Sequence, residues 1–395
     1  MKCKLEDIAE FNPKESIKKG TITKKVSMDK LQPFCRDIYA YEVTEFKGGT
    51  KFKNGDTIMA RITPCLENGK VAKVNILDEG EIGFGSTEYI VLRAKPNITD
   101  EDFLYYLVCS PLVREPAIKS MVGSSGRQRV QTDVMRQLEL EIPSYSEQVK
   151  IGKILKSIDD KIEVNNEINK NLFHQLSTIF KHWFTNNPQL SSMTQVPLAD
   201  LCLVITKGTT PTTLGRPFVS EGINFIKAES ILDSHTIDKN KFAFIDIETN
   251  DLLKRSIIYS GDIIFTIAGT LGRFALVDDS ILPANTNQAV AIIRADKKKV
   301  TSEYLYSFFL GNWHNDYYTK RIQQAVQANL SLGTIKSLPI PILSDSAMSE
   351  YLGIISPIIT MTKSNELEIT KLKNIRDTLL PQLMSGELDV SSIDL

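Results

Sequence analysis

Two stretches of the chain place apolar residues every three or four positions, the spacing of a helix that buries one narrow face. The first begins with Ser144 and Glu147, a pairing typical of a helix N-terminus. Its apolar positions are Ile151, Leu155, Ile158, Ile162, Leu172, Leu176, Ile179 and Trp183, and those of the second stretch are Tyr351, Ile355, Ile358, Ile369, Leu372, Leu379 and Leu383. Neither stretch has a partner in its own half of the sequence. We therefore expect the two helices to pair as an antiparallel coiled coil.

The apolar pattern is interrupted at Asn165 in the first helix and at Asn365 in the second, on the same heptad grid. A seam asparagine lowers stability but fixes the register, because any slip would bury its amide against aliphatic side chains. We expect Asn165 and Asn365 to face each other and to hydrogen-bond. The alternative is that both point to solvent where the seam opens.

The residues before each helix carry short alternating runs bounded by Gly, Pro and Asn, which predict strands. These segments are related, because Asn54–Met59 recurs as Ser260–Phe265 and residues 91–94 recur as 292–295, in the same order. The sequence predicts an α+β fold in which two strand-rich domains are separated by an antiparallel coiled coil of two long helices, with a pseudo-two-fold internal repeat. The expected segments are a first domain at 1–142, a first helix at 143–185, a second domain at 190–343 and a second helix at 344–386.

Composition limits the possible functions of these domains. A formal net charge of −1 over 395 residues argues against a non-specific nucleic-acid binder, which would be strongly basic. The five cysteines are far apart, so they indicate neither a zinc ribbon nor a disulfide framework. No apolar run reaches the ~18 residues of a membrane helix. A cytoplasmic protein is expected.

Motifs for catalysis are missing. A self-sufficient amino-methyltransferase would need an Asn-Pro-Pro-aromatic loop, and both Asn12-Pro13 and Asn187-Pro188 stop after one proline. There is no phosphate-binding G-x4-G-K-[ST] loop, no magnesium-holding carboxylate set and no histidine group spaced to bind a metal. We therefore expect no catalytic residues, no metal and no cofactor on this chain.

Several segments resemble those of one family, the specificity subunits of type I restriction-modification systems. They are the Ile205–Pro211 segment, the Gly261–Ile264 strand, the run from Ile142 to Asp159 that opens the first helix, and the closing Leu379–Leu388. The resemblance covers essentially the whole chain. One departure is that the second helix has Ala347-Met348 where the first has Glu147-Gln148, so the two helices need not dock a partner identically.

The resemblance implies that the two domains are target-recognition domains, each reading one half-site of a split double-stranded DNA sequence. It implies that the helices carry two copies of a methyltransferase subunit, on which S-adenosylmethionine is expected, and that motor and nuclease subunits are further candidate partners. The competing interpretation is a non-catalytic coiled-coil adaptor whose globular ends bind proteins.

Candidate DNA-reading residues are of the types that recognise base edges, namely Arg for guanine and Asn or Gln for adenine. They gather just before each long helix and, as secondary candidates, in other loops. The first cluster is Arg127, Gln128, Arg129 and Gln131, the second is Arg321, Gln323, Gln324 and Gln327, and the secondary candidates are Arg61, Lys70, Lys207, Thr209, Arg216, Arg273 and Asn287. For any of these, the alternative is an exposed residue without a DNA contact.

Overall fold

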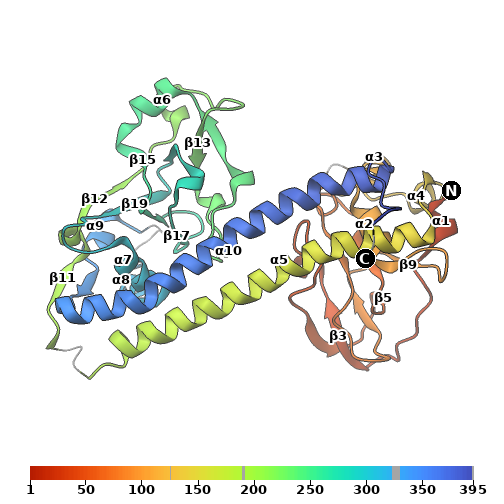
Figure 1. The fold of residues 1–395 in the computed structure, drawn as a ribbon, viewed down its shortest axis with the longest axis horizontal. Coiled ribbons are helices and arrows are strands. Elements are labelled where there is room, and N and C mark those ends of the chain that lie inside the picture. Colours follow the sequence, from red (N-terminus) through yellow and green to blue (C-terminus); the bar gives the residue numbers. More distant parts are fainter. Residues whose placement is uncertain (125, 189–191, 323–329, 394–395) are drawn as a thin grey trace. The chain divides into compact units, whose positions relative to one another are not determined.

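A computed structural model describes residues 1–395 except for Ser125 and residues 189–191, 323–329 and 394–395. The chain forms two compact units, one of Met1–Val164 with Glu368–Leu395 and one of Asn165–Leu367. Each unit contains one strand-rich domain and part of both long helices (Figure 1).

The described residues of the first unit form ten strands and four short α-helices before the first long helix. The elements are β1 Lys2–Lys4, α1 Leu5–Ile8, β2 Ala9–Phe11, β3 Ile22–Val26, β4 Glu42–Glu45, β5 Thr50–Phe52, β6 Thr57–Ala60, β7 Val71–Lys73, β8 Gly83–Gly85, β9 Tyr89–Ala94, α2 Glu101–Cys109, α3 Pro111–Lys119, α4 Thr132–Arg136 and β10 Glu139–Glu141. They form sheets of order β2-β9-β6-β7 and β4-β3-β8-β5, and β1 pairs with β10.

The second unit repeats this arrangement. Its elements are β11 Gln195–Pro197, β12 Cys202–Lys207, β13 Ile223–Ile226, β14 Ala243–Ile245, α6 Ile247–Leu252, β15 Ile257–Ile258, β16 Ile263–Thr266, β17 Phe274–Leu276, β18 Ala284–Thr286, β19 Val290–Ala295, α7 Ser302–Leu310, α8 Trp313–Ile322, α9 Leu332–Lys336 and β20 Pro339–Pro341. The sheet orders are β12-β19-β16-β17 and β14-β13-β18-β15, and β11 pairs with β20. Strand for strand, the topology is that of the first unit, which confirms the internal repeat.

The recurring Asn-Gly-Asp and Ser-Gly-Asp segments have the same structural role in both units. Gly55 and Gly261 adopt φ angles of +90° and +86°, a left-handed turn conformation that favours glycine. The aspartate that follows is almost fully buried and binds an arginine of the neighbouring strand through two hydrogen bonds. Asp56 accepts from Arg93 at 2.7 and 2.8 Å, and Asp262 accepts from Arg294 at 2.8 Å twice. The repeat therefore preserves an ion pair with a buried aspartate, which joins the start of β6 to β9 and the start of β16 to β19.

The long helices are α5 Tyr145–Phe180, which continues into a π-helical turn at Lys181–Thr185, and α10 Asp345–Ser385. In the first unit Asp159 of α5 contacts Arg376 of α10, and Lys161, two positions later, contacts Glu368. Residue numbers that rise along α5 thus meet numbers that fall along α10, which is the predicted antiparallel pairing (Figure 1).

The seam departs from the predicted apolar pattern near its centre. On α10 the buried face runs through Ile355, Ile359 and Thr362, whereas the pattern placed Ile358 there. The amide of Asn365 donates from Nδ2 to Oδ1 of Asn169 at 2.8 Å, so the asparagine it meets lies one helical turn beyond Asn165. Sequence reasoning missed this because polar residues such as Thr362 occupy seam positions, and an apolar pattern cannot show them.

The helices begin in chemically different ways. On α5 the capping pair forms as predicted, with the Ser144 amide donating to Glu147 Oε2 at 2.8 Å. Gln148 is buried and binds its own domain, accepting from the Asp100 amide at 3.2 Å and donating to the carbonyls of Ile98 and Pro143. The equivalent Met348 on α10 packs with the apolar core of the second unit. The departure noted in the sequence thus changes how each helix is attached to its own domain.

Candidate nucleic-acid interface

In the first domain the arginine-rich segment 126–131 lies on the hairpin that joins β6 to β7. The Thr63 amide donates to the carbonyl of Gln128 at 3.0 Å, and the Gln128 amide donates to Oγ1 of Thr63 at 3.1 Å. The Val130 amide donates to the carbonyl of Arg61 at 2.8 Å. These bonds bring Arg61, 69 positions earlier than Val130 in the sequence, beside the predicted loop.

The side chains of this cluster differ in how free they are. Arg127 is exposed and makes no side-chain hydrogen bond within the described part of the chain, and Gln131 is also exposed. Arg129 donates to both carboxylate oxygens of Glu88, at 2.6 and 2.9 Å, and Nε of Arg61 lies 3.9 Å from the same carboxylate. The hydrogen bond from Arg129 lowers the pKa of the Glu88 carboxyl, so that this group is charged at neutral pH.

Two secondary candidates brace equivalent hairpins. Lys70 precedes β7 and donates from Nζ to the carbonyl of Met28 at 2.8 Å. Arg273 precedes β17, donates from Nη1 to the carbonyl of Ile231 at 3.3 Å, and binds both oxygens of Asp233 at 2.7 Å. Both side chains thus spend part of their hydrogen-bonding capacity on their own domain.

In the second domain Lys207, Thr209 and Asn287 gather where β12 ends and β19 begins. A Cβ at Gly208 would lie 1.9 Å from the carbonyl oxygen of Thr286, so only glycine fits between them. This close approach explains the Lys-Gly-Thr order of the sequence motif. Lys207 is exposed, and Thr209 Oγ1 accepts from Arg255 at 3.3 Å.

The remaining candidates lie in other loops or outside the described residues. Arg216 is 3.4 Å from Glu248 of α6. The backbone of Arg321 belongs to α8, but its side chain is outside the description, and Gln323, Gln324 and Gln327 lie outside the described residues. The second amide-rich cluster therefore stays a prediction.

Most described candidates surround the same end of the central sheet in each domain. In the first domain β6 ends at Ala60, opposite Tyr89 of β9, and in the second β16 ends at Thr266, opposite Val290 of β19. We call this region the reading edge. It comprises residues 61–70, 86–88, 121–124 and 126–131 of the first domain and residues 207–210, 267–273 and 287–289 of the second.

Sequence reasoning missed Glu88, Asp233 and Arg255, which hold candidate side chains at these edges. Nothing in the local sequence marks them. Glu88 is 41 residues from Arg129, and Asp233 is 40 residues from Arg273, so only the fold shows that they are partners.

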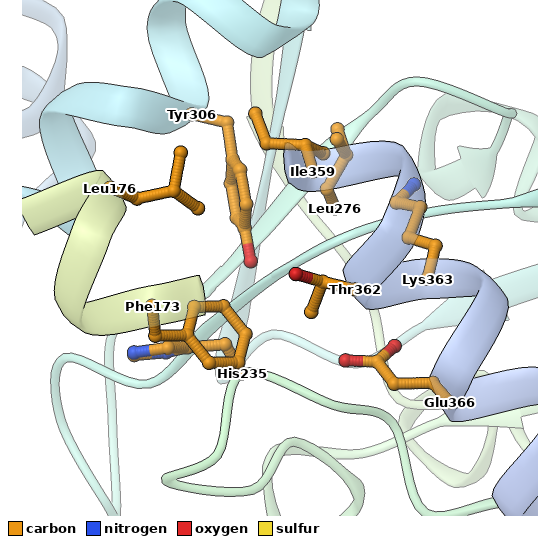
Figure 2. Close-up of a pocket in the computed structure, with 9 residues that line it drawn as sticks. All are labelled: Phe173, Leu176, His235, Leu276, Tyr306, Ile359, Thr362, Lys363 and Glu366. Carbon is orange, nitrogen blue, oxygen red and sulfur yellow. The ribbon is translucent and has the colours of Figure 1, made fainter. Parts of the chain in front are cut away.

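A small cavity lies between α5, α10 and the second domain within the second unit. Figure 2 shows the hydroxyls of Tyr306 and Thr362 directed toward the same space, with His235 and Glu366 at its lower side. Its volume is about 20 Å³, room for one water molecule rather than a nucleotide-sized cofactor. Burial raises the pKa of Glu366 to about 7 and lowers that of His235 to about 4.

The described residues hold neither a cluster that could bind a metal ion nor a membrane-spanning helix. They contain no group of three His, Cys, Asp or Glu side chains arranged to hold a metal ion. Within the same residues, no helix combines the length and the apolar character needed to cross a membrane.

Two copies of one α+β scaffold, with different polar side chains at the same sheet end, define a protein with two related recognition modules. The family model described as the type I restriction modification DNA specificity domain matches residues 1–174 and again residues 191–374. The chain therefore belongs to this family, and its role is that of a DNA specificity subunit of a type I restriction-modification system.

Individual relatives agree over most of the chain. The HindI specificity subunit of Haemophilus influenzae is 26% identical, covering 85% of this chain and 87% of that protein. The MjaIX specificity subunit of Methanocaldococcus jannaschii is 24% identical over 74% of this chain and 70% of its own length. The crystal structure of the S subunit from M. genitalium matches 99% of this chain and 96% of that one with a TM-score of 0.57 at 16% identity, a likeness of fold.

Proposed function

We propose that the chain reads a bipartite DNA target, with residues 1–142 reading one half-site and residues 190–343 the other. The observation that carries this proposal is the combination of one shared topology with two different reading edges. Arg61 and Glu88 of the first edge correspond to Ile267 and Ala289 of the second, because both pairs are joined by the same backbone hydrogen bond. A common frame with different edge chemistry suits two readers of different sequences.

The helices are the proposed docking surface for two methyltransferase subunits. In each unit, the long helices expose large apolar side chains outside the seam. A group of exposed apolar side chains is typical of a surface that binds another protein. The exposed side chains are Val164 and Ile375 in the first unit and Ile168, Ile354, Met361 and Leu367 in the second. In this proposal the docked subunits bind S-adenosylmethionine and transfer the methyl group. Motor and nuclease subunits bind the same assembly. We place this assembly in the cytoplasm.

The test is selection from a random pool of double-stranded DNA by the chain in complex with its methyltransferase subunits. The retained molecules should share two short blocks separated by unread bases. A second selection uses a chimaera in which residues 190–343 are replaced with the equivalent domain of the HindI specificity subunit. The selected DNA should then differ in one block only. Absence of any selected sequence would favour the protein-binding adaptor, and a change in both blocks would rule out one reader per domain.

A further inference from the structure

Arg129 is held by Glu88 along one edge of its guanidinium group. Its Nε is 2.9 Å from Oε2 and its Nη2 is 2.6 Å from Oε1, so the two planar groups meet side-on. Such a bidentate pair fixes the plane of the guanidinium as well as its position. A lysine could not be held in this way, because its ammonium group has no plane to fix.

The backbone beneath Arg129 is also held in place. The amide of Arg129 donates to the carbonyl of Val122 at 2.9 Å, and the amide of Val122 donates back at 3.1 Å. The next residue, Val130, is buried and bonded to the carbonyl of Arg61. The backbone at Arg129 is therefore fixed by hydrogen bonds although the loop is exposed, and this fixes the position of the Arg129 Cα.

The guanidinium keeps unused donors that face away from Glu88. An arginine has five N–H groups, and the side-on pair uses the one on Nε and one on Nη2. One N–H of Nη1 and the second N–H of Nη2 form a fork at the far end, which makes no hydrogen bond within the described residues, and the side chain is 45% exposed. A fork of this kind matches the O6 and N7 acceptors of guanine in the major groove.

The second domain lacks this device at the equivalent place. The Leu330 amide donates to the carbonyl of Ile267 at 3.0 Å, as the Val130 amide donates to Arg61. Ile267 takes the position of Arg61, and Ala289 takes that of Glu88. The second domain therefore has neither the arginine nor the carboxylate at these two positions. The bidentate pair of Glu88 and Arg129 is thus a feature of the first reading edge and not of the shared scaffold.

We propose that Glu88 is a positioning residue that presents Arg129 to a guanine in the half-site read by the first domain. The inference rests on the proposed function, because it needs that domain to read DNA. Arg129 makes the base contact, and Glu88 acts only through it. Arg61, which lies near the same carboxylate, adds positive charge toward the phosphates. The second half-site is not read by a carboxylate-held arginine at the equivalent position.

The experiment compares the wild-type chain with E88Q, R129A and the double variant, each in complex with the methyltransferase subunits, by selection from random DNA and by titration of the selected site. E88Q removes the carboxylate charge but keeps the side-chain size. We expect preference for guanine at one position of the first half-site to fall about 10-fold or more in E88Q and in R129A. The double variant should lose no more than R129A alone, since Glu88 acts through Arg129.

The matched control is E115Q, which removes the same charge from an exposed ion pair with Lys119 on α3 of the same domain. It should leave the guanine preference unchanged. The second half-site serves as an internal control for folding, because every variant should still select it.

Three results would overturn the inference. If E88Q tightens binding to all sequences equally while the guanine preference stays, Glu88 only shields a phosphate-binding arginine. If E88Q or R129A leaves the preference unchanged, Arg129 does not read that base. If the double variant loses discrimination beyond R129A, Glu88 does not act through Arg129. Failure of the proposed function looks different, since the wild-type complex would then select no sequence at all.

Discussion

The ion pair between Asp159 and Arg376 gives the sharpest test of how the two long helices are joined in the first unit. Asp159 Oδ1 accepts from Arg376 Nη1 at 2.8 Å and Oδ2 accepts from the hydroxyl of Tyr106 at 2.7 Å, and the side chains of the pair are only 6% and 10% exposed. Arg376 has a second acidic partner in Asp377, which is 62% exposed. Loss of the arginine therefore leaves a buried carboxylate, whereas loss of the aspartate leaves the arginine still paired with the exposed Asp377.

The expected magnitudes follow from this asymmetry. Two charges ~4 Å apart attract by about 4 kcal/mol at an effective dielectric constant of 20. R376L should cost about 3–5 kcal/mol of unfolding free energy, because the Asp159 charge stays buried with only the Tyr106 hydroxyl beside it. D159N should cost about 1–2 kcal/mol, because its amide can still accept from Tyr106 and Arg376 keeps Asp377. The double variant D159N/R376L should be more stable than R376L alone.

The assay is urea unfolding followed by far-UV circular dichroism. Tryptophan fluorescence is unsuitable, because Trp183 and Trp313 both lie in the second unit. The matched control is K161A, which breaks an exposed 3.6 Å ion pair with Glu368 between the same two helices and should cost below about 1 kcal/mol. The reasoning is refuted if R376L is no more destabilising than K161A, or if adding D159N brings no recovery.

Two further predictions concern the second unit. Glu366 has a folded-state pKa of about 7, above its ordinary 4.5, so the folded protein binds this proton more tightly and the contribution to stability falls as pH rises from about 4.5 to 7. Between pH 5 and pH 8, the unfolding free energy of E366Q should therefore rise by about 1–3 kcal/mol relative to that of the wild type, as measured by paired urea titrations. A difference between the two proteins that does not change with pH would contradict the raised pKa. N365L should cost about 1–3 kcal/mol, because Oδ1 of Asn169 loses its donor while Nδ2 still donates to the carbonyl of Thr362. N169L/N365L should recover part of this cost in the same assay, and equal losses would refute the pairing.

The sequence predicted the large-scale fold well because its signals are local and periodic. Heptad spacing depends on neighbours within a few positions, and it placed both long helices. The repeat of Asn54–Met59 as Ser260–Phe265 placed two equivalent strands, β6 and β16. The seam register was harder, because Asn169 and Thr362 occupy buried positions that an apolar pattern skips.

The candidate site was predicted less completely, since the sequence shows which side chains can read DNA but not which are already bound. Arg127 and Arg129 are two positions apart and look equivalent in the sequence. In the structure Arg127 is exposed without a side-chain partner among the described residues, whereas Arg129 is fixed by Glu88. This difference depends on a strand end far away in the sequence, where only the fold brings the carboxylate into contact.

The paired arginines also give physical meaning to a net charge of −1 in a protein that recognises DNA. A free arginine attracts any phosphate, which raises affinity for all sequences alike. A companion carboxylate, such as Glu88 beside Arg129 or Asp233 beside Arg273, cancels much of this attraction but leaves donors for a base edge. The non-specific affinity then falls more than the specific affinity, and the ratio of the two determines how well a target is found among competing sites. We therefore expect a specificity subunit built in this way to bind general DNA weakly when it is alone.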